Sequence, residues 1–264
     1  MPEGDSVWQT AHRLHAALAG RVLVRSDLRV PRLATVDLRG HAVESVRSRG
    51  KHLLTRFDHG WTLHSHLRME GSWRVFETGQ GWRGGPVHQI RAILANEAYA
   101  AVGYRLPVLE LMRTADETRV VGHLGPDLLG EDWDPDEALR RLRRAPDRAL
   151  GEALLDQANL AGIGNVYKSE LCFLTGVTPW TPVAEVPDLP RLVGQAHRLL
   201  EFNRQRPVRV TTGDTRPGRT LWVYGRDRHP CARCGTPIRS AGQGRPGEER
   251  ITYWCPSCQP GPTP

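Results

Sequence analysis

The sequence predicts an α+β protein: an N-terminal helix with a β-sandwich, a helical middle part, and a C-terminal β-hairpin that carries four cysteines. Three observations predict it. An amphipathic helical pattern at the N-terminus is followed, up to about residue 114, by short segments of alternating or β-branched residues that are typical of strands. Beyond residue 123 the apolar residues recur at helical spacing. Two Cys-x2-Cys pairs then lie near the end of the chain. We expect domain boundaries at residues 1–121, 122–225 and 226–260.

Each element has its own signal. A helix is expected over residues 5–19, because apolar residues share one face and Gly20 ends the pattern. Eight short strands predict a sandwich or barrel-like pair of sheets; they are expected at residues 21–26, 42–48, 51–57, 61–67, 72–76, 88–96, 99–104 and 108–112. Further helices are expected at residues 136–144, 149–157, 166–174 and 189–203, and hairpin strands at 232–240 and 250–255.

Composition narrows the class of protein. The chain has 264 residues, of which 39% are hydrophobic, and this is enough for a buried core. No run of apolar residues is long enough for a transmembrane helix, and the start lacks the pattern of a secretory signal. We therefore expect no membrane partner and a cytoplasmic location.

The charge is unevenly distributed. The net charge is +7, and residues 204–250 contain 11 Arg against four acidic residues, a local excess of +7. A basic segment of this kind attracts a polyanion, usually nucleic acid. The alternative is a solvated basic face with no partner.

Four cysteines have the spacing of a metal site. Cys231 and Cys234 form one Cys-x2-Cys pair, and Cys255 and Cys258 form the other. Four thiolates suit one tetrahedral Zn²⁺ ion, which in such a closed site is structural. Two disulfides are the alternative, but they need an oxidising compartment. The fifth cysteine, Cys172, lies in an apolar helical stretch and is expected to pack in the core.

The first residues offer a nucleophile. Met before Pro is normally removed, which leaves Pro2 with a secondary amine whose unperturbed pKa is about 8. Attack of this amine on a sugar C1′ gives a cationic iminium that favours β-elimination, and Glu3 lies beside it to move protons. An ordinary chain terminus is the alternative.

Three further motifs can contact phosphate. Lys51 follows Gly50 at the start of a strand, and it is one of only two lysines in the chain. A glycine-rich turn leads into a helix at Asn165, with the other lysine, Lys168, one turn further on. Arg250 precedes the second cysteine pair. Taken singly, each is also compatible with an ordinary surface position or helix hairpin.

Taken together and in this order, the motifs resemble the Fpg/Nei family of DNA glycosylases over essentially the whole chain. They are PEG at the terminus, RGK near residue 50, HSHLRMEGSW near 70, LAGIGNVY near 165 and RITYWCPSCQ at the end. The start PEGD resembles the endonuclease VIII (Nei) branch, notably its actinobacterial members.

The resemblance implies roles for individual residues. Pro2 would form a Schiff base, Glu3 would act as general acid and base, Lys51 would act in β-elimination, and Arg250 would hold phosphates and assist δ-elimination. It also implies a helix-two-turn-helix in which Asn165 binds the DNA backbone. The damaged base must leave the stack, and the loop Arg68-Met69-Glu70 matches the family's void-filling position, with Met69 as its apolar member.

The chain departs from the Nei pattern at several positions. Arg68-Met69-Glu70 replaces Gln-Leu-Tyr, and Ser6 with Asp5 beside it replaces an acidic residue at position 6. His123 stands where some Nei proteins have a DNA-contacting Arg, so that contact would be weaker or pH-dependent. The Arg-Phe-Gly wedge of the Fpg branch is absent around residues 103–106, and the loop 211–219 is short. The absent wedge and the short loop both favour oxidised pyrimidines over 8-oxoguanine as the substrate.

Three hypotheses follow. The first is a monomeric, nucleoid-associated DNA glycosylase and AP lyase that acts on oxidised pyrimidines in damaged DNA. The second is the same chemistry on oxidised purines. The third is a non-catalytic zinc-finger DNA-binding protein, which explains the charge and the cysteines but not Pro2, Glu3 and Lys51 together.

Overall fold

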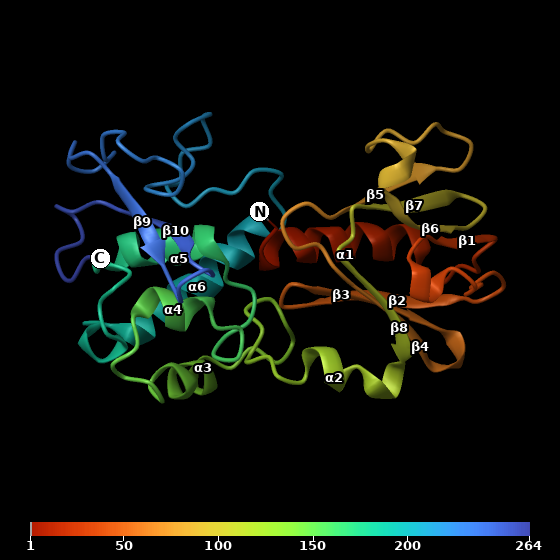
Figure 1. Cartoon of the computed structure of the whole chain (residues 1–264), viewed down its shortest axis with the longest axis horizontal. Helices are drawn as coiled ribbons and strands as arrows, with labels where there is room; N and C mark the ends of the chain where they lie inside the picture. Colours follow the sequence, from red (N-terminus) through yellow and green to blue (C-terminus); the bar gives the residue numbers. More distant parts are fainter. Residues whose placement is uncertain (1) are drawn as a thin grey trace. The chain divides into compact units, whose positions relative to one another are not determined.

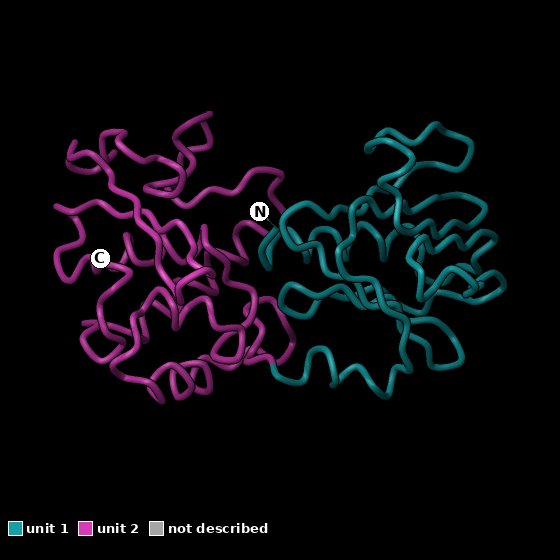
Figure 2. The backbone as a smooth tube through the Cα atoms, viewed as in Figure 1, with its two compact units in different colours: residues 1–123 teal, residues 124–264 magenta. Residues whose placement is uncertain are grey.

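The computed structural model describes residues 2–264, and the chain forms two compact units, Met1–His123 and Leu124–Pro264 (Figure 2). Both α-helices and antiparallel sheets are present (Figure 1), so the predicted α+β class is confirmed. No helix within the described residues combines the length and the apolar character needed to cross a membrane.

Two four-stranded antiparallel sheets and one helix build the first unit. One sheet has the order β1-β6-β7-β5 and the other β2-β3-β4-β8. Helix α1 (Gly4–Leu18) contacts strands of both sheets, and its apolar face joins their core through Val7, Ala11 and Leu14. The strands are β1 (Arg25–Leu28), β2 (Val43–Arg49), β3 (His52–Phe57), β4 (Trp61–His66), β5 (Ser72–Glu77), β6 (Ile90–Ala95), β7 (Tyr99–Tyr104) and β8 (Val108–Arg113).

The second unit is helical and includes the C-terminal hairpin. Its helices are α3 (Pro135–Leu142), α4 (Leu150–Leu155), α5 (Asn165–Thr175) and α6 (Leu189–Asn203). Helix α5 is buried over most of its length and contacts α4, α6 and the hairpin. The hairpin strands are β9 (Arg239–Gln243) and β10 (Arg250–Trp254), with β10 packed on α5 (Figure 1).

Some boundaries differ from those expected. The first strand was expected at residues 21–26, but β1 begins at Arg25, because Val22 and Val24 are exposed and only a single bridge pairs this stretch. The first hairpin strand was expected from residue 232, but residues 231–236 form a turn in which Gly235 has a φ of 79°. A short helix, α2 (Thr118–Val121), was not predicted. The hairpin lies within the second unit.

Candidate active site and nucleic-acid interface

The N-terminal residues lie at the start of α1. Met1 lies outside the described residues. Pro2 is half-buried, and Glu3 is fully buried at 0% exposure, where it precedes the first turn of α1 and accepts the Val7 amide proton at 3.0 Å through its main-chain oxygen. Asp5 is also buried, and its Oδ1 accepts the Ser6 amide proton at 2.7 Å. Two buried carboxylates therefore lie at the start of α1, where the helix dipole favours negative charge.

Lys51 lies in the turn between β2 and β3. Arg49 pairs with His52 across the ladder, which leaves Gly50 and Lys51 as a two-residue turn. Gly50 has a φ of 55°, a left-handed conformation that costs glycine least, so glycine is favoured in this tight turn. The turn holds the half-buried Lys51 at the end of a sheet.

Four histidines gather beside this turn, and the sequence reasoning did not identify them as a group. His52 Nδ1 lies 2.9 Å from His64 Nε2, and the ring of His66 contacts His52 edge to face at 4.9 Å between centroids. The exposed His123 lies further out, with its ring 6.2 Å from that of His52. His64 Nδ1 faces Glu110 Oε2 at 3.4 Å. The cross-strand pairing of His52 with His66 is the signal that could have identified the group.

Three of these histidines, His52, His64 and His66, are held uncharged near pH 7. Burial lowers the pKa of His52 to about 3, and the neighbouring histidines and Lys51 add to the effect. Burial likewise lowers the pKa of His66 to about 4. Burial also lowers the pKa of His64, although Glu110 opposes the shift.

The loop between β4 and β5 exposes Met69. The Gly71 amide donates to the Leu67 carbonyl oxygen at 2.8 Å, which closes the loop, and a Cβ at Gly71 would lie 2.6 Å from that oxygen. Met69 is 57% exposed, and Arg68 beside it is exposed with a φ of 45°. An apolar side chain held out on a short, closed loop is suited to insertion between bases.

No apolar wedge is present at the turn after β7. Leu106 is 4% exposed and packs in the core of the first unit. Arg105 contacts the Met69 loop instead, since its Nε donates to the Glu70 carbonyl oxygen at 3.3 Å. This agrees with the absence of an Arg-Phe-Gly wedge in the sequence.

In the second unit, Asn165 is the first residue of α5. The preceding Gly164 provides no side-chain cap, and Asn165 Nδ2 donates to the Ile251 carbonyl oxygen on β10 at 2.7 Å. Its Oδ1 is buried without a hydrogen-bond partner among the described residues. The side chain therefore joins the helix start to the hairpin.

Lys168, which was expected to add charge at this phosphate-binding turn, is buried. Its side chain is 0% exposed, and Nζ donates to Thr252 Oγ1 and, at 3.4 Å, to Gln243 Oε1. Arg250, by contrast, is exposed at the first position of β10, where it pairs with Gln243 across the ladder.

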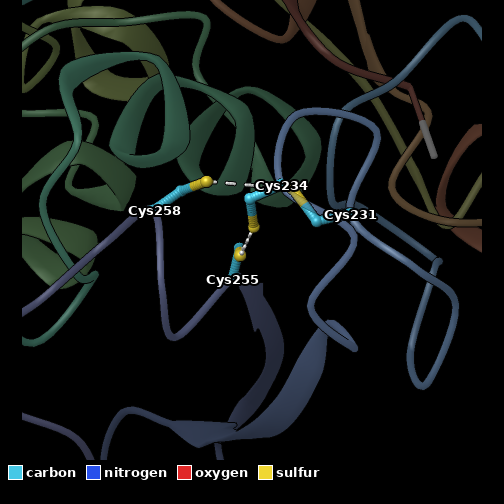
Figure 3. Close-up of side chains that lie close together, drawn as sticks. All are labelled: Cys231, Cys234, Cys255 and Cys258. Carbon is cyan, nitrogen blue, oxygen red and sulfur yellow. Dashed lines mark hydrogen bonds between the residues drawn. The ribbon is translucent and has the colours of Figure 1, made fainter.

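The four hairpin cysteines form a candidate metal site (Figure 3). Their sulfur atoms all lie within 4.8 Å of one another; Cys231 and Cys258 are 3.9 Å apart, and Cys234 and Cys255 are 3.4 Å apart. A tetrahedral site with metal–sulfur bonds of about 2.3 Å has sulfur–sulfur edges of about 3.8 Å. All five cysteines are free rather than paired in disulfides. Burial raises the pKa of the fifth, Cys172, to about 12, which fits its expected place in the core.

Comparisons with known proteins agree with this arrangement. Family models match the formamidopyrimidine-DNA glycosylase N-terminal domain over residues 1–104 and its H2TH domain over residues 124–201. A probable endonuclease 8 2 of Streptomyces coelicolor is 67% identical over 100% of this chain and 96% of its own length. The DNA-(apurinic or apyrimidinic site) lyase Nei2 of Mycolicibacterium smegmatis is 51% identical over 98% of this chain and 99% of its own length.

The fold has solved counterparts. The Fpg of Lactococcus lactis, in a complex with DNA that contains an abasic site, matches with a TM-score of 0.79 and 22% identity, over 98% of this chain and 100% of that chain. The two family models and the extent of the curated relatives show that this chain belongs to the Fpg/Nei family of DNA glycosylases.

Proposed function

We propose that this chain is a bifunctional DNA glycosylase and AP lyase of base excision repair. The observation that carries the proposal is Glu3, a fully buried carboxylate that directly follows Pro2 at the start of α1. A buried acid beside a secondary amine is what a proton transfer at an amine–sugar adduct requires. The names of the two curated relatives, an endonuclease 8 and an AP-site lyase, support the same activity.

The first chemical step joins Pro2 to the sugar. After removal of Met1, the Pro2 nitrogen bonds to C1′ of the damaged nucleotide, the bond from C1′ to the base breaks, and the departing base takes up a proton. The nitrogen then loses its own proton, O4′ takes a proton from Glu3, and the C1′–O4′ bond breaks. The product is an open sugar held as an iminium on Pro2.

Two eliminations follow. The iminium withdraws electrons from C2′, so loss of a C2′ proton breaks the C3′–O3′ bond and releases the downstream strand with its 5′-phosphate. Loss of a C4′ proton then breaks the C5′–O5′ bond and leaves a 3′-phosphate upstream. We assign Lys51 to the first elimination and to a phosphate contact, and Arg250 to the flanking phosphates and the second elimination.

The remaining candidate residues hold the DNA. Asn165 lies at a helix start, where amide groups suit a phosphate. Met69 fills the gap left by the extruded base, with Arg68 beside it, and the exposed His123 contacts the backbone. We expect a monomer associated with damaged DNA in the bacterial nucleoid.

The substrate class we favour is oxidised pyrimidines. The buried Leu106 leaves no apolar wedge at the turn after β7, and the loop 211–219 is short for a cap over an oxidised purine. The names of the endonuclease 8 relatives favour the same branch. Oxidised purines such as 8-oxoguanine are the second candidate.

Zinc is the metal that the hairpin would hold. Cys231, Cys234, Cys255 and Cys258 supply four sulfur donors at distances that suit a tetrahedron. Such a closed site fixes the hairpin and leaves no position for a catalytic water.

Borohydride trapping tests the proposal. Matched duplexes would contain thymine glycol, 8-oxoguanine or an abasic site, and reduction would fix any iminium as a covalent adduct. We expect an adduct on thymine glycol and on the abasic site. Pro2→Ala supplies a primary amine whose imine is cationic only when protonated, so we expect the adduct to fall about tenfold or more.

Glu3→Gln separates the two activities. Without the acid that opens the sugar ring, the adduct on thymine glycol is lost, whereas the already hydrolysed abasic site still reacts. A dominant adduct on 8-oxoguanine would keep the chemistry and overturn the substrate class. No adduct even at the abasic site, from protein shown by mass to lack Met1, would instead support the non-catalytic DNA-binding protein.

A further inference from the structure

A buried polar cluster lies under the hairpin strand that carries Arg250. It consists of Lys168 on α5, Thr252 on β10 and Gln243 on β9, with exposed fractions of 0%, 0% and 4%. An ammonium group in the interior is costly unless it is hydrogen-bonded. The Lys168 ammonium lies on the buried side of β10, the strand that carries Arg250, so we asked what its hydrogen bonds do for that strand.

The hydrogen bonds run from Lys168 to the main chain of Arg250. Lys168 Nζ donates to Thr252 Oγ1, and Thr252 Oγ1 donates in turn to the Arg250 carbonyl oxygen at 3.0 Å. Thr252 thus uses both its acceptor and its donor capacity, and the connection reaches Arg250 in two bonds.

The opposite strand is held from the same point. Gln243 pairs with Arg250 across the ladder, its Oε1 accepts from Lys168 Nζ at 3.4 Å, and its Nε2 donates to the Pro179 carbonyl oxygen at 2.7 Å. Helix α4 leaves room for this amide through Gly151, where a Cβ would lie 2.2 Å from Gln243 Oε1. The main chain of Arg250 and the side chain of Gln243, which form the ladder pair next to the turn, are therefore both held by buried hydrogen bonds.

This pair needs fixing because it borders the turn 244–249, which connects β9 to β10. The thiolate site holds the other end of the hairpin, where Cys255 follows β10. A two-stranded hairpin is only marginally stable by itself, and its ends open most readily. The cysteine site and the Lys168 cluster hold opposite ends of one short ladder.

From these contacts we propose that Lys168, acting through Thr252 and Gln243, is a positioning residue that sets the place of Arg250 for δ-elimination. The inference rests on the proposed function and adds a residue to that reaction. It replaces the direct phosphate contact expected of Lys168. The Arg250 guanidinium binds phosphate, and Lys168 fixes the main chain from which it extends.

The test measures the ratio of the two strand ends formed on a duplex with one abasic site. β-Elimination leaves an unsaturated aldehyde and δ-elimination a 3′-phosphate, and a denaturing gel separates them. Lys168→Met and Thr252→Val are expected to lower the δ-to-β ratio about tenfold, the size of effect that loss of a charge-assisted hydrogen bond gives. Thr252→Ser keeps the hydroxyl and should stay within about twofold of the parent protein.

Two further measurements separate positioning from general damage. In an Arg250→Ala background, Thr252→Val should lower the ratio no further, because the group that it positions is gone. Hydrogen exchange at the amides of residues 250–252 should be faster in Thr252→Val, while borohydride trapping and the zinc content stay at parent levels.

An unchanged ratio in folded Thr252→Val would overturn the inference while leaving the proposed function intact. The inference would also be overturned if Thr252→Val lowered the δ-to-β ratio equally in the parent protein and in the Arg250→Ala background. If Lys168→Met fails to fold, Thr252→Val and Thr252→Ser carry the test by themselves. Failure of the parent protein to cleave or trap abasic DNA would instead reject the proposed function and this inference with it.

Discussion

His52, His64 and His66 show how strongly the fold sets the charge of single residues beside a proposed catalytic turn. Burial lowers the pKa of His52 to about 3 and that of His66 to about 4, so both are neutral in the folded chain near pH 7. In the unfolded chain a histidine titrates near pH 6.5. The difference makes the stability of the first unit depend on pH.

Stability should therefore fall on acidification. Above about pH 6.5 neither state binds the protons, and the full stability is present. Between about pH 6.5 and pH 3 the unfolded state takes up protons that the folded state refuses, so the free energy of unfolding falls, by at most about 1.4 kcal/mol per unit of pKa difference for each histidine. Urea unfolding at pH 7.5, 6.0 and 5.0 measures the slope.

His52→Asn should flatten this slope, because one of the groups that resist protonation is removed. His88→Gln is the matched control, since His88 is exposed and its replacement should leave the slope as it is. Equal slopes in His52→Asn and the parent protein would contradict the assignment of the acid sensitivity to the cluster.

Met69 is the residue whose proposed role depends on duplex structure. At 57% exposure it contributes little to the core, so Met69→Ala should change the free energy of unfolding by less than about 1 kcal/mol. Excision of thymine glycol from a duplex should fall about tenfold, because the gap left by the extruded base is unfilled. The same lesion in single-stranded DNA leaves no gap, and its excision should be nearly unaffected. Equal losses on both substrates would argue against a wedge.

The sequence proposes candidate reactive residues more readily than supporting ones. Pro2, Lys51 and Arg250 are candidates because the motifs around them, taken in order, resemble those of one family, although each alone fits an ordinary position. Gln243 and Thr252 are not, because single amide and hydroxyl side chains are common everywhere and only the packed structure shows that these two are buried. The same limit applies to Lys168: its sequence neighbours do not reveal that β10 covers it.

At the scale of elements, α5 supports two segments of the second unit through buried polar side chains. Lys168 holds the hairpin, and two residues further on Glu170 holds the segment after α6. The Glu170 carboxylate, at 0% exposure, accepts the main-chain amide protons of Trp222, Val223 and Tyr224 at 2.8 to 2.9 Å, and also a proton from Thr211 Oγ1. One side chain thereby fixes both ends of the short loop 211–222.

Glu170→Gln should be strongly destabilising despite its similar shape. The new amide nitrogen is a donor, so it faces main-chain N–H groups that have lost their acceptor. Each buried group left unsatisfied costs about 1–3 kcal/mol, and we expect a loss of about 3 kcal/mol in the free energy of unfolding, measured in urea. Glu152→Gln on α4 is the control; its carboxylate is 39% exposed and lies 3.9 Å from Arg148, so less than about 0.5 kcal/mol is expected. Similar losses in the two variants would show that the buried carboxylate has no special role.

Element boundaries follow local signals where those signals are strong. Helix α6 runs over the expected residues 189–203, because its apolar spacing and the Asp188 cap agree. Strand β1 is polar at Arg25, Ser26 and Asp27, so its sequence lacks the usual alternation; it forms because β6 offers an antiparallel partner. Strand β9 begins late because the cysteine turn occupies the residues before it. The start of β1 depends on its pairing partner β6, and the start of β9 depends on the cysteine turn before it. Neither can be predicted from the few residues around the boundary.

At the scale of the whole molecule, the two units differ in architecture, and both carry a net positive charge, +5 in the first and +2 in the second. The first combines α1 with two sheets, and the second combines helices with the hairpin. The basic excess of residues 204–250 lies entirely in the second unit. Two of the eleven arginines in this segment already pair with carboxylates: Arg216 with Asp214 at 2.6 Å, and Arg204 with Glu201 at 3.0 Å. Arginines paired in this way are less available to phosphate, so the net charge by itself does not give the number of phosphate contacts.

The salt dependence of DNA binding measures how many phosphate contacts the protein makes. Each phosphate contact releases counterions, so the logarithm of the binding constant falls against the logarithm of salt concentration with a slope of about −0.9 per contact. Arg250→Gln should reduce the magnitude of this slope by about one and weaken binding alike on damaged and undamaged duplexes, because phosphate carries no sequence information. Arg29→Gln is the control from the first unit, since Arg29 pairs with Asp27 at 2.8 Å and should leave the slope unchanged. Fluorescence anisotropy at several salt concentrations measures both. A slope that is unchanged in Arg250→Gln, or reduced equally in both variants, would mean that the basic excess acts as a diffuse field rather than through a phosphate contact at Arg250.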